Sequence, residues 1–152
     1  MKDAETLTTI LEAEAEAASV VYSRLKLAQE SIVGISGTEL AEFVRSGPDL
    51  VQPLESLEKE RVRCAERLGA ALFPDGSQEV GTMTVHELVR YLPAADAIAV
   101  SGAANRLRQV VGNIVAVNGQ NRLLLERSRR FVEETLRIVT DDHTRTLIDQ
   151  RM

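Results

Sequence analysis

The segment 93–140 contains no proline after its first residue and repeats apolar side chains at helical spacing. The repeat includes Ile98, Val117 and Leu124 and continues to Val139, in steps of three and four residues. A helix over this segment would be ~69 Å long, whereas the first helical pattern, over 3–35, gives ~50 Å. The rest of the chain is therefore expected to pack along part of this helix.

The composition favours helices over sheets. Apolar residues make up 44% of the chain and aromatic residues only 3%, so Leu, Val, Ile and Ala must fill the core. We predict an all-α fold, an elongated antiparallel helical bundle in which long helices form a coiled-coil-like hairpin and short helices connect them. Residues 1–140 are expected to form a single domain, followed by a flexible C-terminal tail over 141–152, where the apolar periodicity is lost.

The second long helix is expected to begin only after a break at residues 46–48. Residues 38–44 read as a short helical segment, and Ser46, Gly47 and Pro48 interrupt it. Because proline fits a helix near its first turn, the long helix is predicted to begin at about Asp49 or Gln52 and to end at Leu72.

Each of the first two long patterns has one charged residue on its apolar stripe. These are Glu14 in the first pattern and Arg61 in the second. The stem of Arg61 is expected to pack on the stripe while its head either reaches a carboxylate on another helix, for which Glu14 is a candidate, or extends into solvent. A contact with a partner protein is the alternative.

Turn and cap signals separate the second long helix from the last. A loop is predicted over 73–82, where Pro74, Asp75 and Gly76 follow one another. Thr84 and Glu87 then match a capping box, which starts a short helix that runs up to Pro93.

The sequence lacks the patterns that most enzymes and metalloproteins need. Cys64 is the single cysteine, so it has neither a disulfide partner nor a zinc-binding partner, and it is expected to be a small buried hydrophobe. No phosphate loop, dinucleotide fingerprint or histidine-carboxylate motif occurs. We therefore predict no catalytic residues, no metal site and no cofactor.

Charge and hydropathy limit the partners. The net charge of -5 gives no basic excess with which to neutralise phosphates, so nucleic acid is an unfavourable partner. No apolar run approaches the ~20 residues that span a bilayer, and the N-terminus has no signal-peptide core. A cytoplasmic protein without membrane insertion is expected.

The order of these features resembles the FlgN family of flagellar export chaperones. The resemblance covers residues 5–140 and rests on the long first helix, the Leu-Glu-Lys-Glu-Arg run that ends at Arg61, the short capped helix, and the Asn-x-x-Asn-x-x-Leu-Leu motif that starts at Asn118 and is followed by Ser128. It implies a chaperone of type III export that binds the C-terminal helical segments of hook-associated (hook-filament junction) proteins. It also implies that the chaperone prevents their premature assembly and delivers them to the flagellar export apparatus.

The family carries client binding on its C-terminal helix. In this sequence the expected client-binding residues are Asn118, Asn121, Leu124, Leu125, Ser128, Phe131 and Val132. The leucines, Phe131 and Val132 would supply apolar contacts, and the two asparagines would supply amide hydrogen bonds. Alternatively, an asparagine on the helix seam fixes the helix register inside the bundle. The alternative function is a self-associating structural or signalling bundle without a secretion client, and a homodimer is left open.

Overall fold

The computed structural model describes residues 1–34, 37–78 and 83–151, and of residues 141–151 it describes only the helix. Its elements are α1 (Lys2–Val33), α2 (Gly37–Leu72), α3 (Val85–Leu88), the 3₁₀ turn η2 (Val89–Tyr91) and α4 (Ala94–Arg151). All regular structure in these ranges is helical. The predicted all-α fold of long packed helices is confirmed.

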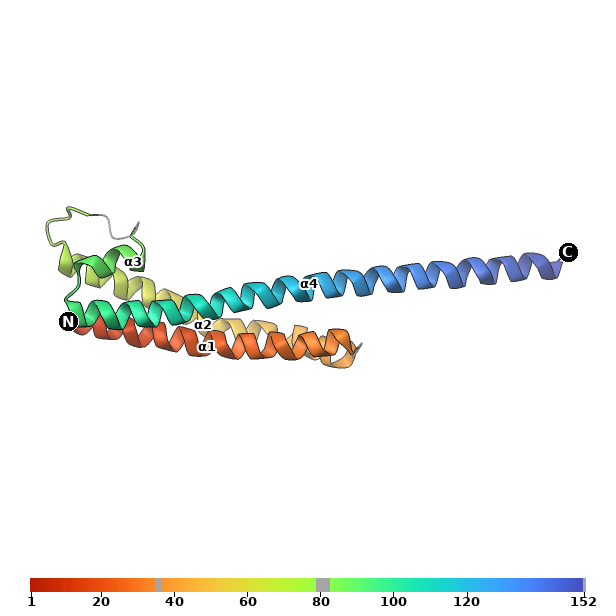
Figure 1. Ribbon diagram of the computed structural model, residues 1–152, viewed down its shortest axis with the longest axis horizontal. Helices are drawn as coiled ribbons and strands as arrows, with labels where there is room; N and C mark the ends of the chain where they lie inside the picture. Colours follow the sequence, from red (N-terminus) through yellow and green to blue (C-terminus); the bar gives the residue numbers. More distant parts are fainter. Residues whose placement is uncertain (35–36, 79–82, 152) are drawn as a thin grey trace.

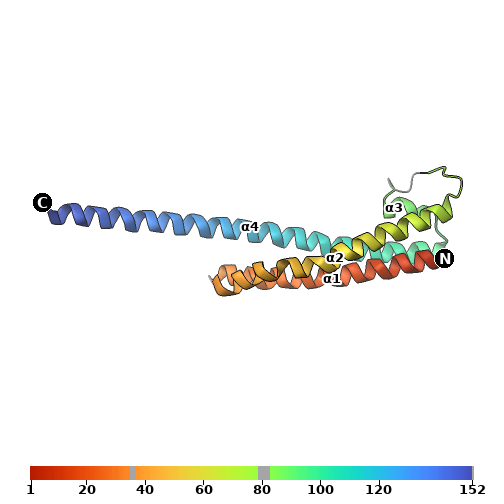
Figure 2. The same ribbon diagram turned by 180° about the vertical axis from the view of Figure 1, so that it is seen from behind.

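The helix α1 is the central element, because it packs against both α2 and α4 (Figures 1 and 2). The helices α1 and α2 run antiparallel as a hairpin. Since α2 returns the chain to the end where α1 begins, α4 starts beside Met1 and runs parallel to α1. The amino group of Met1 lies 3.2 Å from the carboxylate Oδ2 of Asp96, which fixes the two helix starts side by side.

The hydrophobic core lies at this shared end of the bundle. All three long helices and the short helix α3 contribute to it, since a helix buries an apolar stripe only against other elements. The largest fully buried side chains are those of Leu7, Leu11, Leu68, Val100 and Cys64. Burial of Cys64 confirms its predicted role as a small core residue.

The helix α2 is continuous, which corrects the predicted break near residue 46. It begins at Gly37 and contains Pro48 and Pro53 in its interior, in place of a helix that starts at Asp49 or Gln52. Each proline removes one backbone hydrogen bond. Both prolines are exposed, so water can reach the carbonyl groups that lose their donors, and packing of the opposite face on α1 maintains the helix.

The predicted turn and cap are both present. The backbone N–H of Gly76 donates to the carbonyl of Phe73 over 3.0 Å, and Gly76 has a φ of 68°, which suits glycine. Thr84 accepts a hydrogen bond from the N–H of Glu87, whose carboxylate accepts one from the N–H of Thr84, so the capping box is confirmed. Residues 79–82 of the predicted loop lie outside the described residues.

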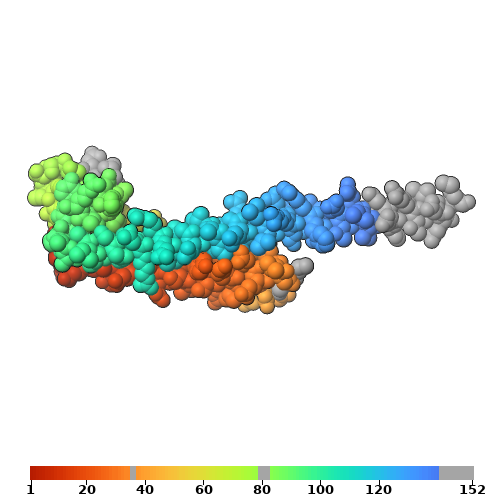
Figure 3. Space-filling view, viewed as in Figure 1, coloured from red at the N-terminus to blue at the C-terminus, as the bar shows by residue number. Residues whose placement is uncertain are grey.

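The helix α4 continues beyond the predicted end at residue 140. Its 58 residues give a length of ~87 Å, and it extends well past the ends of α1 and α2 (Figure 3). Residues 141–152 contain neither proline nor glycine, so loss of the apolar periodicity does not by itself end the helix. The division into a domain over 1–140 and a tail over 141–152 stays a prediction.

Candidate functional site

The face of α4 that contacts α1 follows a strict seven-residue repeat. Its core positions are buried or half-buried and are spaced alternately by three and four residues, as in a coiled coil. We define them as the covered seam: Leu107, Val110, Ile114, Val117, Asn121, Leu124 and Ser128. The seam is a product of the heptad spacing in the sequence, and α1 is the helix that covers it.

Two contacts fix the register of α1 on α4. The side-chain amide Nδ2 of Asn121 donates to the backbone carbonyl of Leu25 over 3.1 Å, and the Nε2 of Gln29 donates to the Oε1 of Gln120 over 3.1 Å. Eight residues beyond Leu25, α1 ends at Val33. Since the helices are parallel with equal rise, the two contacts place the end of α1 opposite residues 124–129 of α4.

The same heptad repeat continues on α4 beyond this point, where no other described element covers it (Figures 1 and 3). We define the exposed seam as Phe131, Val132, Thr135, Ile138 and Val139. The side chain of Phe131 is 69% exposed, whereas Val117 in the covered seam is 3% exposed. An apolar stripe of this kind in water marks an interaction surface.

The two predicted asparagines lie in different surroundings. Asn121 is 5% exposed and bonds to α1, which is the geometry of the register alternative. Its Oδ1 is buried and has no hydrogen-bond partner among the described residues. Asn118 is exposed on the surface of α4. The helix therefore does not present the two amides together.

The other predicted residues follow the boundary between the two seams. Leu124 and Ser128 are half-buried at the end of the covered seam, while Leu125 is 41% exposed on its flank. Phe131 and Val132 open the exposed seam. All five residues lie on one continuous face of α4. The assignment of these residues as client contacts stays a prediction.

Ile138 and Val139 also belong to this face but were not among the predicted site residues. They are 51% and 59% exposed. The signal that identifies them is the heptad spacing, because Leu124, Phe131 and Ile138 follow one another at intervals of seven residues.

Between residues 122 and 139, α4 carries more arginines than glutamates. Among the described side chains of α4, three ion pairs form within the helix: Arg129 with Glu133, Arg130 with Glu126, and Arg137 with Glu134. Arg127 flanks the exposed seam and makes no ion pair among the described residues. It is thus available to a partner carboxylate.

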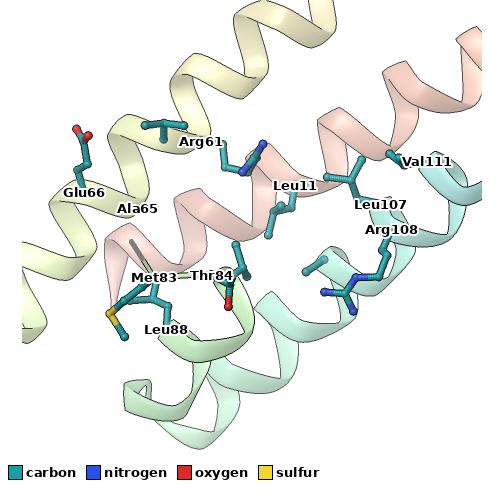
Figure 4. Close-up of a pocket in the computed structure, with 13 residues that line it drawn as sticks. Leu11, Arg61, Ala65, Glu66, Met83, Thr84, Leu88, Leu107, Arg108 and Val111 are labelled. Atoms are coloured by element: carbon teal, nitrogen blue, oxygen red, sulfur yellow. The ribbon is translucent and has the colours of Figure 1, made fainter. Parts of the chain in front are cut away.

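A hollow also lies between α2, α3 and α4, and Leu11 of α1 is among the residues that line it (Figure 4). Its volume is about 520 Å³, and Leu88, Leu107 and Val111 line it together with Arg61 and other residues. It forms because α1 separates α2 from α4, and α3 fills only one end of the gap. The lining is mainly apolar and contains no cluster of catalytic groups.

The buried titratable groups serve packing. The Sγ of Cys64 lies 3.3 Å from the carbonyl oxygen of Asp3 and donates to it, and burial raises the pKa of the thiol, which disfavours the reactive thiolate. Burial also raises the pKa of the Glu14 carboxyl, and the hydrogen bond and charge of Arg61 lower it by less. Neither group faces a partner nucleophile or base.

The described part of the chain contains no group of three or more His, Cys, Asp and Glu side chains arranged to hold a metal ion. Among the described helices, none combines the length and the apolar character that a bilayer span requires. The exposed seam of α4 is the candidate surface for binding another macromolecule, because its apolar side chains are open to water.

Comparison with known proteins agrees with this conclusion. The model of the FlgN protein family matches residues 1–148, which is nearly the whole chain. No curated protein and no solved structure matches the chain. The match includes the covered seam and the exposed seam of α4. The chain therefore belongs to the FlgN family, whose members are non-enzymatic flagellar export chaperones that bind hook-associated proteins.

Proposed function

We propose that the exposed seam of α4 binds the C-terminal helical segment of a hook-associated protein in the cytoplasm. The observation that carries the proposal is the change in exposure along one heptad face, from 3% at Val117 to 69% at Phe131. A client segment of this kind is an amphipathic helix built for self-assembly. An apolar stripe on the chaperone can cover its apolar face without any covalent chemistry.

The predicted client residues divide into two roles in this proposal. Leu125, Phe131 and Val132 supply exposed apolar area, and Asn118 supplies an exposed amide beside them. Asn121, Leu124 and Ser128 position the exposed seam by packing on α1. In this proposal, shielding of the client face prevents premature assembly, and the chain then delivers the client to the flagellar export apparatus, a step that membership in the family supports.

The decisive experiment measures binding of the C-terminal segment of a hook-associated protein from the same genome by isothermal titration calorimetry. In the Phe131→Asp variant a charge would be buried against the client's apolar face, so binding should weaken at least tenfold. Leu123→Asp is the matched control, since Leu123 is 56% exposed and lies away from the seam. A folded wild-type chain that binds none of the junction proteins would contradict the proposal.

A self-associating bundle remains the second candidate, because the same exposed seam could cover itself in a homodimer. Sedimentation of the free chain distinguishes the two functions. If the chain is a stable dimer that Phe131→Asp dissociates, and if no junction protein binds, the structural or signalling function is supported.

A further inference from the structure

The end of α1 leaves a vacant helix position on α4. From the shared N-terminal end to residue 128, the core positions of α4 are filled by one parallel helix, α1. Phe131, Thr135 and Ile138 continue the same core positions and are exposed. In a coiled coil, a partner helix covers the core positions along their whole length. Here the core positions of α4 continue past the end of α1, the helix that covers them.

We propose that the partner helix occupies this vacant position end to end with α1, parallel to α4, with its N-terminus beside Gly34. This inference rests on the proposed function and adds the placement and direction of the bound helix. Because α1 fills the seam up to residue 128, the bound helix must begin or end at that point. The exposed seam, 131–139, accommodates about two and a half turns of helix.

The electrostatics of the junction select the direction. The C-terminal end of a helix carries a partial negative charge, and the last turn of α1 contains no basic residue. The carboxylate of Glu39, from the first turn of α2, accepts a hydrogen bond from Ser31 over 2.7 Å and adds negative charge beside this end. The N-terminus of a partner helix carries a partial positive charge and is therefore favourable beside Gly34. A helix bound in the opposite direction would place two negative helix ends against each other.

The side chains of the exposed seam indicate which residue sizes and charges a partner helix needs. Thr135 is small and leaves space for a large apolar residue, while Phe131 and Ile138 require smaller ones. Val132 and Val139 widen the stripe on one flank, and the unpaired Arg127 on the other flank favours a partner carboxylate near the start of the bound helix. The partner is thus a heptad helix with a carboxylate on the flank that faces Arg127.

A second copy of this chain fits the vacant position poorly. A parallel α4 would need the space that α1 fills, because its residues before 128 would continue along the same seam. An antiparallel α4 centred on the exposed seam would bring Phe131 opposite the small Thr135 of the copy, but it would also place Glu134 close to the Glu134 of the copy. Like charges at this flanking position oppose pairing.

Disulfide trapping tests the placement. Ser128→Cys and Thr135→Cys each put one thiol at a core position of the seam with little change in size, and Cys64 is 0% exposed, so the unmodified chain serves as the blank. The probe is the C-terminal segment of a hook-associated protein from the same genome, with one cysteine at the N-terminal end of its bound helix, about two turns further along, or at the C-terminal end. Val111→Cys, in the hollow between α2, α3 and α4, is the control site.

The Ser128→Cys variant should trap the probe with the N-terminal cysteine at least fivefold more than the probe with the C-terminal cysteine. The Thr135→Cys variant should trap probes whose cysteine lies about two turns further along. The reverse preference at Ser128, or efficient trapping at Val111, would overturn the inference while leaving the chaperone function intact. Absence of binding in calorimetry would contradict the chaperone function itself.

Discussion

The Nε of Arg61 lies 2.8 Å from the Oε2 and 3.1 Å from the Oε1 of Glu14, so one guanidinium nitrogen joins both oxygens of a carboxylate inside the α1–α2 hairpin. Glu14 is 4% exposed, and it is the charged residue of the α1 seam. The predicted pairing of these two residues is confirmed. The pair fixes how α1 and α2 face each other, because either charge alone would be buried without compensation.

Loss of Arg61 should therefore destabilise the hairpin. We expect Arg61→Met to lower the free energy of unfolding by about 3 kcal/mol at pH 7, near the low end for a broken buried pair because Arg61 is partly exposed to water. Urea denaturation followed by circular dichroism measures this change. The double variant Glu14→Leu with Arg61→Met should recover most of the loss, and a double variant as unstable as the single one would contradict the role of the buried charge.

The raised pKa of Glu14 predicts a pH dependence. Burial raises the folded-state pKa of this carboxyl above its unfolded value of about 4.3, so its contribution to stability is complete below that value and is lost as pH rises through the folded pKa. The stability of the wild-type chain minus that of Glu14→Gln should thus fall as the pH rises above about 4.3. Parallel denaturation series at several pH values check this, and a difference that grows with pH would show that Arg61 outweighs burial.

Asn121→Leu should stabilise the free chain. The variant removes a buried Oδ1 without a described partner and fills a heptad core position with an apolar side chain, for a gain of about 1 kcal/mol in the free energy of unfolding. The carbonyl of Leu25 can still accept the helical hydrogen bond within α1. Asn118→Leu is the control and should change stability little, because Asn118 is exposed.

The same Asn121→Leu variant separates the two roles of the asparagine. If Asn121 only fixes the register of α1 on α4, the affinity for the hook-associated segment should stay within about twofold of wild type. Loss of client binding together with a gain in stability would instead indicate direct contact with the client.

Pro53→Ala should also stabilise the chain. The substitution restores an N–H donor for the carbonyl of Asp49 and improves helix propensity, so a gain of about 1–3 kcal/mol is expected. Thermal and urea unfolding measure it. No gain in either measurement would indicate that α2 is already distorted at this position in a way that alanine does not repair.

Much of the fold follows from local patterns in the sequence. The apolar spacing of α1 and α4, the turn at Gly76 and the capping box at Thr84 were predictable because each depends on residues within a few positions of one another. The break predicted in α2 was wrong, since contacts with α1 outweigh the local cost of Pro48 and Pro53.

The candidate site was only partly predictable. The sequence identified Phe131 and Val132, because apolar residues on a long amphipathic helix are visible in the spacing alone. It could not separate Asn118 from Asn121, since the difference depends on which side of α4 faces α1. A helix whose apolar stripe is wide gives no local signal of that choice.

The sequence by itself determined that this protein is a set of long amphipathic helices with one apolar stripe that continues beyond residue 128, because heptad spacing is a local property of the chain. Only the tertiary structure decided where that stripe is covered. The hydrogen bond from Asn121 to Leu25 and the ion pair between Met1 and Asp96 fix the register of α1 on α4. Together with the length of α1, this register places the end of α1 near residue 129. Coverage depends on distances between residues far apart in sequence, and those distances exist only in the folded bundle.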